Sequence, residues 1–123
     1  MAPPSALTIA AQSVQRLVKE ESYYHKEQAS QEARIQKLEE DIKTKAGTED
    51  LDQNAEYMLK QEQKALAETK NVFSPLHQRI ADAVQKLEEQ LAISESDGTA
   101  SEEEIKKAKE ALEAGQKIAE KED

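Results

Sequence analysis

Apolar residues recur every three or four positions over the first third of this chain, and no glycine or proline interrupts residues 5–46. The series begins with Leu7 and Val14 and continues to Ile35 and Ile42. This spacing places side chains on one face of an α-helix, so a single helix of about 40 residues, roughly 60 Å long, is predicted. A chain of 123 residues that places so many of them in one amphipathic helix must fold by packing helix against helix.

Two further helices are predicted downstream. The same spacing runs from Ala55 to Leu87 and straight through Pro75, where the missing hydrogen bond predicts a kink rather than a break. Thr48 is placed to cap the start of this second helix. The Ser-Glu-Glu-Glu run at residues 101–104 has the pattern of a capping box and begins a third, weaker apolar stripe. The predicted helices cover about residues 5–46, about 49–93 and about 101–120.

Short connections between these helices predict that neighbours run antiparallel. If the first two helices fold back at Gly47, facing residues have numbers that add to 97, and this single register brings both apolar series together. It places Leu38 opposite Leu59 and Tyr24 opposite Phe73. The sequence therefore predicts one all-α domain over all 123 residues, an elongated antiparallel three-helix bundle of coiled-coil type with a shorter third helix.

The third predicted helix is about half as long as the others, so it covers only the end of the bundle that holds the N-terminus and Leu87. The other end is predicted to be a two-helix arm with polar residues at interior positions, namely Gln28, Gln31, Glu62 and Thr69. Such an arm buries little apolar area, so it is expected to be marginally stable unless another molecule docks on it.

Charge and composition narrow the possible partners. The chain carries 26 acidic against 17 basic residues, a net charge of −9, so neither nucleic acid nor an anionic membrane is expected to bind it. No apolar run is long enough to span a membrane, and the start of the chain lacks the basic and apolar parts of a secretory signal, which favours the cytosol. Without cysteine there is neither a disulfide framework nor a thiolate zinc site.

No catalytic chemistry is predicted, so we expect no enzyme and no metal or other cofactor. His25 and His77 lie on different helices without carboxylates at metal-ligand spacing and are expected to be exposed and inert. There is no glycine-rich phosphate loop, and a narrow bundle offers no pocket in which a pair of carboxylates could be tuned. Tyr23 and Tyr57 fall outside the heptad interior and are candidate interface anchors.

Two blocks of sequence contain motifs that a generic coiled-coil composition would not produce. The first is VQRLVKEE at residues 14–21, followed by YHKE at residues 24–27. The second is AEYMLKQE at residues 55–62, followed by LAET at 66–69 and by FSPLHQRI, with its internal proline, at 73–80. Together they resemble the first and second helices of the tubulin-binding cofactor A family. The region from the capping box onward matches that family only in length and helical pattern.

The likeness covers about residues 5–93, and the Pro-Pro start and acidic linker resemble fungal members. Membership would imply a cytoplasmic chaperone of the microtubule cytoskeleton that binds β-tubulin after its release from the chaperonin. It would use no nucleotide and would hold the quasi-native subunit until other cofactors build the αβ heterodimer. Two tyrosines and the charged residues outside the interior, most of them in the matching blocks, are then the candidate tubulin-binding residues: Arg16, Lys19, Glu20, Tyr23, Tyr57, Lys60, Lys64, Glu68 and Arg79.

Two other interpretations stay open. A prefoldin-like subunit is also a coiled-coil chaperone, but it needs a β-hairpin between its long helices, and residues 46–52 are too few to form one. A generic dimeric coiled-coil scaffold would need neither the third helix nor the capping box. The sequence decides neither whether the chain is a monomer or a homodimer nor which face would contact tubulin.

Overall fold

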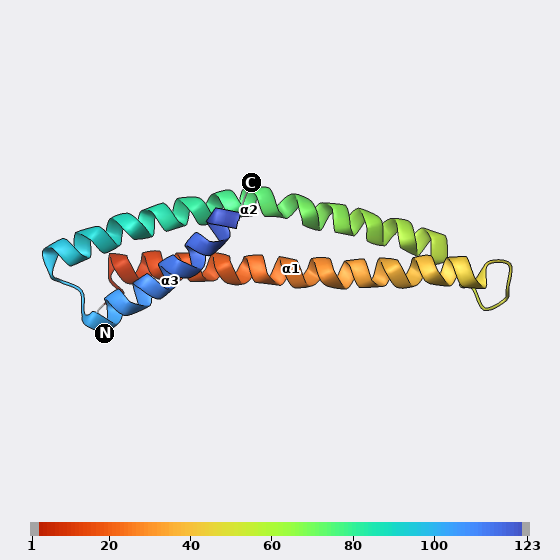
Figure 1. The fold of residues 1–123 in the computed structure, drawn as a ribbon, viewed down its shortest axis with the longest axis horizontal. Helices are drawn as coiled ribbons and strands as arrows, with labels where there is room; N and C mark the ends of the chain where they lie inside the picture. The colour runs from red at the N-terminus through yellow and green to blue at the C-terminus, as the bar shows by residue number, and fades with distance from the viewer. Residues whose placement is uncertain (1–2, 122–123) are drawn as a thin grey trace. The chain divides into compact units, whose positions relative to one another are not determined.

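The computed structural model describes residues 3–121, which form three α-helices and no strand: α1 (Ala6–Lys45), α2 (Ala55–Asp97) and α3 (Glu102–Lys121) (Figure 1). The predicted all-α three-helix fold with a shorter third helix is confirmed. α2 continues through Pro75, and the kink expected there stays a prediction. The prediction that the chain starts without a secretory signal includes residues 1 and 2, which lie outside the described part of the chain.

The turn between α1 and α2 is longer than predicted, because α2 begins at Ala55 rather than near residue 49. Thr48 does not cap α2: its amide and its hydroxyl both donate hydrogen bonds back to the Lys45 carbonyl oxygen, at 3.0 and 2.6 Å. The carbonyl oxygen of Asn54 accepts the first hydrogen bond of α2. The turn contains no strand, so the β-hairpin of a prefoldin-like subunit is not present at this position.

The connection between α2 and α3 is short. α2 continues to Asp97, beyond its predicted end near residue 93, and stops at Gly98, whose positive φ of 67° is the left-handed conformation that ends many helices. The predicted capping box is confirmed, because the Glu104 amide donates to Ser101 Oγ at 3.1 Å and the Ser101 amide donates to Glu104 Oε1 at 3.3 Å.

The chain divides into two compact units, and α1 and α2 each contribute to both. The first, which we call the three-helix unit, contains α1 up to Glu21, α2 from Ser74 onward and all of α3. The second, which we call the two-helix unit, is Ser22–Phe73 and contains the rest of α1, the turn and the rest of α2. Each unit has its own set of buried residues.

The three-helix unit has a mainly apolar centre, in which Glu21 and Ser94 are the buried polar residues of its described part. Its largest fully buried side chains are Leu7, Val14, Leu76, Ile80 and Leu87, all at interior positions of the predicted heptads. Ala11, Val84 and Leu91 are buried as well, although they lie outside those positions. They are buried because a third helix covers a side of α1 and α2 that pairing between two helices alone would leave in solvent.

α3 packs into this unit through small residues. Ala108, Ala111 and Gly115 are buried, whereas the predicted core residue Leu112 is only half-buried. A Cβ atom on Gly115 would lie 2.6 Å from Val84 Cγ2 and 2.8 Å from Val14 Cγ1. Glycine has a low helix propensity, but at position 115 the absence of a side chain allows α3 to approach the other two helices closely.

The interior of the two-helix unit is small and partly polar. Its buried apolar residues are Ile35 and Ala55, and the polar residues Gln31 and Thr69 are buried as well, with 5% and 8% of their surface exposed. The polar interior predicted at those two positions is confirmed. Gln31 Oε1 and Glu62 Oε2 are buried with no hydrogen-bond partner among the described residues. Because an unsatisfied buried acceptor costs about 1–3 kcal/mol, this unit has weak internal support.

Contacts inside each unit confirm that α1 and α2 run antiparallel near the predicted register. In the two-helix unit, Arg34 Nε donates to Glu62 Oε1 at 3.1 Å. In the three-helix unit, His77 Nε2 lies 2.9 Å from Glu21 Oε2. The predicted register pairs residues whose numbers add to 97. The numbers of Glu21 and His77 add to 98 and those of Arg34 and Glu62 add to 96, so each pair lies within one residue of that register.

Candidate functional site

The nine predicted tubulin-binding residues divide between the two units. Arg16, Lys19, Glu20 and Arg79 belong to the three-helix unit, and Tyr23, Tyr57, Lys60, Lys64 and Glu68 belong to the two-helix unit. All are exposed except Glu20, which is half-buried. The candidate site therefore comprises two separate surfaces, one in each unit.

In the three-helix unit, an open groove runs between α1 and α2. Small or apolar residues line its α1 side, among them Ala10 and Leu17, and the Ile9 side chain beside them is 55% exposed. Arg79 lines the α2 side, and its Nη2 lies 3.6 Å from Glu20 Oε1. Sequence reasoning missed Ile9, because it falls outside the heptad interior where a solvent-facing polar residue is the default. The groove thus combines an exposed aliphatic side chain, Ile9, with one of the predicted charged residues, Arg79.

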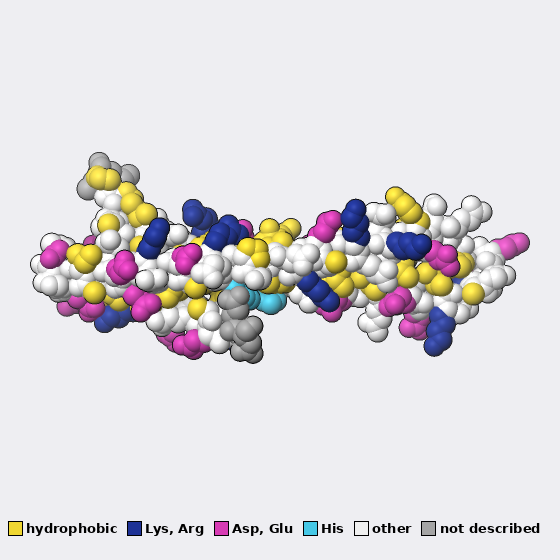
Figure 2. Space-filling model, turned by 90° about the horizontal axis from the view of Figure 1, so that it is seen from above, with side chains coloured by type: hydrophobic (Ala, Val, Ile, Leu, Met, Phe, Trp, Pro, Cys, Tyr) yellow, Lys and Arg dark blue, Asp and Glu magenta, His cyan; other side chains and the backbone are white. Residues whose placement is uncertain are grey.

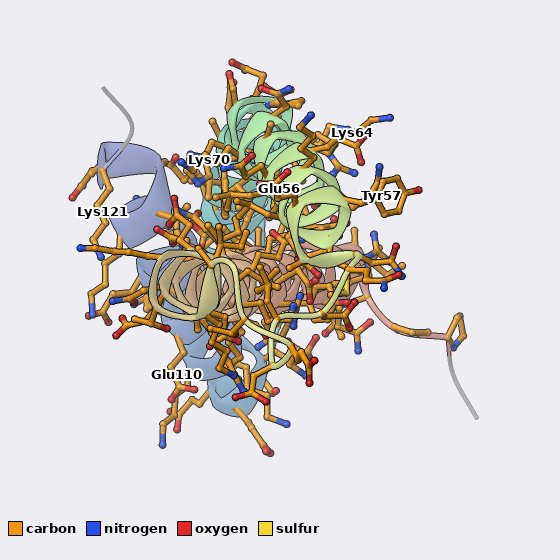
Figure 3. All side chains as sticks on the ribbon, turned by 90° about the vertical axis from the view of Figure 1, so that its right-hand side faces the viewer. Glu56, Tyr57, Lys64, Lys70, Glu110 and Lys121 are labelled. Carbon is orange, nitrogen blue, oxygen red and sulfur yellow. The ribbon has the colours of Figure 1, made fainter. Side chains whose placement is uncertain are left out.

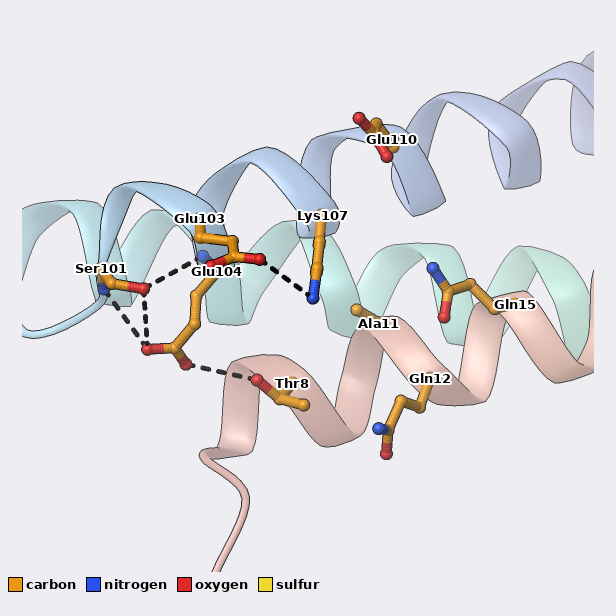
Figure 4. Close-up of a pocket in the computed structure, with 9 residues that line it drawn as sticks. All are labelled: Thr8, Ala11, Gln12, Gln15, Ser101, Glu103, Glu104, Lys107 and Glu110. Atoms are coloured by element: carbon orange, nitrogen blue, oxygen red, sulfur yellow. Dashed lines mark hydrogen bonds and ion pairs between the residues drawn. The ribbon is translucent and has the colours of Figure 1, made fainter.

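A different side of α1 is occupied by α3, and one carboxylate joins the starts of the two helices (Figure 4). Glu104 Oε2 accepts hydrogen bonds from Ser5 Oγ at 2.7 Å and from Thr8 Oγ1 at 3.2 Å, while its Oε1 completes the capping box with Ser101. The hydrogen bond from Ser5, followed by that from the Ser101 backbone, holds the pKa of Glu104 below its usual value. This arrangement links the start of α3 to the start of α1.

In the two-helix unit, a second open groove lies between α1 and α2. Leu38 contributes from α1, and Tyr57 and Met58 contribute from α2 with 65% and 36% of their surface exposed. Tyr57 is the residue that sequence reasoning singled out, whereas Met58 was missed for the same reason as Ile9. Tyrosine and methionine are residue types that protein interfaces favour, because one is a rigid anchor and the other adapts its shape.

The other aromatic and histidine residues agree with the expectations only in part. Tyr23 is exposed and packs its ring edge-on against Tyr24, with ring centroids 5.4 Å apart. Phe73 stacks on His25 at 4.6 Å instead of pairing with Tyr24. His77 is half-buried rather than exposed and inert, because its Nε2 lies 2.9 Å from the buried Glu21 carboxylate on α1.

The metal-ligating residue types of residues 3–121 are not clustered in either unit. No three side chains of His, Cys, Asp or Glu in this part of the chain are grouped to hold a metal ion. None of its helices is long and apolar enough to cross a membrane. On the face shown in Figure 2, basic and acidic side chains alternate with hydrophobic ones. Both grooves set apolar residues among charges of both signs, a composition that protein–protein interfaces share.

Comparison with known proteins identifies the family. The chain matches the family described as Tubulin binding cofactor A over residues 2–112. It is 33% identical over 86 residues to the Tubulin-specific chaperone A of Saccharomyces cerevisiae, a match that covers 70% of this chain and 72% of that protein. No solved structure matches the chain at a significant level. The chain belongs to the tubulin binding cofactor A family, as its sequence blocks indicated, and this family is not a known class of enzyme.

Proposed function

We propose that this chain is a tubulin-folding chaperone that captures quasi-native β-tubulin without a nucleotide, before the αβ heterodimer is assembled, and then passes it to further folding cofactors. Family membership over residues 2–112 is the observation that carries this proposal. The relative named as a tubulin-specific chaperone supports it. Its place of action would be the cytoplasm, on subunits destined for microtubules.

The proposed binding residues contribute little to the stability of the fold, which is consistent with a role in contacting β-tubulin. Exposed ion pairs contribute only about 0–1 kcal/mol to stability, and the Arg79–Glu20 pair is of this exposed type. Lys19 and Lys60 form no ion pair with any described residue. We therefore assign β-tubulin contact to the predicted surface residues of both units: Arg16, Lys19, Glu20, Tyr23, Tyr57, Lys60, Lys64, Glu68 and Arg79.

The direct test is to mix the purified chain with β-tubulin that has just been released from the chaperonin, without added nucleotide. We expect a 1:1 complex on native gels and in size-exclusion chromatography. Assembled αβ-tubulin, added as the matched control, should not be retained. Retention of the αβ dimer but not of free β-tubulin, or retention of neither, would contradict the proposed function.

The assigned residues are tested with Lys19→Ala, Lys60→Ala and Arg79→Ala. Each variant should keep the thermal midpoint within a few degrees, because no core contact is removed. At least one should weaken β-tubulin capture by about 2–5 kcal/mol, the usual cost of removing one partner of a desolvated charged contact. If all three bind like the parent chain, the assignment of these surfaces is wrong.

A further inference from the structure

The groove of the two-helix unit is open, and its walls are mainly apolar. Leu38 on α1 and Tyr57 and Met58 on α2 supply the apolar side chains, over about two helical turns. The two-helix unit has no third helix to cover this groove, because α3 belongs entirely to the other unit. An apolar groove of this length fits a short amphipathic segment better than a flat protein surface.

The charged residues around this groove differ in how they are used. Both carboxylates that line it are already paired: Glu62 Oε1 lies 3.1 Å from Arg34 Nε, and Asp41 Oδ1 lies 3.8 Å from Lys45 Nζ. Lys37, which also lines the groove, forms no ion pair with any residue among 3–121.

Lys60 and Lys64, three and seven residues after Tyr57, likewise form no ion pair with a described residue. Tyr57 and Lys64 project from one side of α2, and Lys70 projects from another (Figure 3). A carboxylate brought by a partner would therefore meet the unpaired ammonium of Lys37 in the groove, and Lys64 projects from the same side of α2 as Tyr57. A partner cation would instead meet carboxylates that already have a basic neighbour.

We propose that the groove between Leu38 and Tyr57–Met58 is the docking site for a short, acidic, amphipathic segment of the captured tubulin subunit, which inserts apolar side chains against Tyr57 and Met58 and places its carboxylates near Lys37 and Lys64. This inference rests on the proposed function and adds to it the chemistry of the partner's docking segment. The net charge of −9 gives no long-range attraction for an acidic partner, so recognition depends on this local arrangement.

The experiment measures binding of chaperonin-released β-tubulin to matched variants of the full chain. Lys64→Glu and Lys70→Glu change the net charge equally and both lie on exposed positions of α2, but only Lys64 projects on the same side as Tyr57. We expect Lys64→Glu to raise the dissociation constant by about tenfold or more and Lys70→Glu by less than about twofold. The effect of Lys64→Glu should shrink as salt is added.

A second matched pair tests the apolar wall. Tyr57→Ala removes the proposed anchor, and Ile93→Ala removes a comparably exposed apolar side chain of the three-helix unit that belongs to neither groove. We expect Tyr57→Ala to weaken binding by about tenfold or more and Ile93→Ala to leave it unchanged. All four variants should unfold at the parent's temperature, because none removes a buried side chain.

The outcomes separate this inference from the proposed function. Failure of the parent chain to bind β-tubulin would contradict the proposed function itself. Normal binding by the parent together with equal effects of Lys64→Glu and Lys70→Glu would overturn the acidic partner segment, and tighter binding by Lys64→Glu would show that the segment is basic. Normal binding by Tyr57→Ala would overturn the groove as the docking site.

Discussion

The three-helix unit and the two-helix unit are built from the same two helices but have different interiors. In the three-helix unit, α3 covers α1 and α2, and leucine, isoleucine and valine side chains are fully buried. In the two-helix unit, only Ile35 and Ala55 are buried apolar residues, and two buried acceptors lack a hydrogen-bond partner within the described chain. The difference shows that a third helix turns an amphipathic pair into a stable core. Without it, the pair in the two-helix unit buries fewer apolar side chains, whereas an open groove between α1 and α2 is present in both units.

The largest expected difference between the units is in the cost of removing a leucine. Leu76 is fully buried in the three-helix unit, so Leu76→Ala should lower the free energy of unfolding by about 2–5 kcal/mol. Leu38 is half-buried in the two-helix unit, so Leu38→Ala should cost about 1 kcal/mol or less. Urea unfolding of both variants measures the contrast. Equal losses would show that the two-helix unit has a core as tight as its neighbour.

A smaller effect is expected where α3 meets the other helices. Gly115→Ala should destabilise the chain by about 1–3 kcal/mol through overpacking against Val84, partly offset by about 1 kcal/mol of helix propensity. Val84→Ala alone should also destabilise it by leaving a cavity. In a thermal unfolding cycle, the double variant should be more stable than the sum of the two losses predicts. Additive losses would mean that Gly115 does not set the approach of α3.

In the two-helix unit we expect a substitution that improves stability. Gln31→Leu removes a buried acceptor without a partner and should raise the free energy of unfolding by about 1 kcal/mol. Gln36→Leu, on the exposed surface of the same helix, is the matched control and should change it by less than about 0.5 kcal/mol. A clear loss of stability in Gln31→Leu would show that the polar interior is a satisfied network.

The smallest expected effect concerns acid. The pKa of Glu104 is lowered in the folded chain, so its stabilising contribution is complete above its unfolded pKa and disappears as pH falls through the folded pKa. Glu104→Gln removes this titration. Between about pH 7 and about pH 3, the parent should therefore lose slightly more stability than the variant. The same pH dependence in both chains would show that this carboxylate does not contribute.

Helix positions and most of the interior could be predicted from the sequence, because spacings of three and four residues specify a helix face directly. The polar interior at Gln31 and Thr69 and the capping box at Ser101 followed from the same kind of local pattern. Tertiary packing decided the rest. The burial of Val84 and the close approach of α3 at Gly115 both depend on where α3 lies, and no local sequence pattern specifies that position.

The misplaced details have local causes too. Thr48 was expected to begin α2, but a threonine after a helix end can also bond backward, and here it closes α1. Tyr57 could be predicted as an exposed candidate anchor because the heptad pattern leaves it outside the interior, and it lines a groove. Ile9 and Met58 were missed because a heptad analysis treats all positions outside the interior as solvated. Which of these residues line grooves depends on how α1 and α2 pair in three dimensions.

Hydrogen exchange of the free chain and of its complex with β-tubulin tests most directly the claim that the three-helix unit is the stable core and that the two-helix unit holds the groove in which a segment of the partner docks. In the free chain, amides of Ser22–Phe73 should exchange much faster than those of the three-helix unit. In the complex, the largest gain in protection should fall on residues 34–41 and 57–64, around the groove of the two-helix unit. Equal protection of both units in the free chain, or a gain in protection confined to the three-helix unit, would contradict this claim.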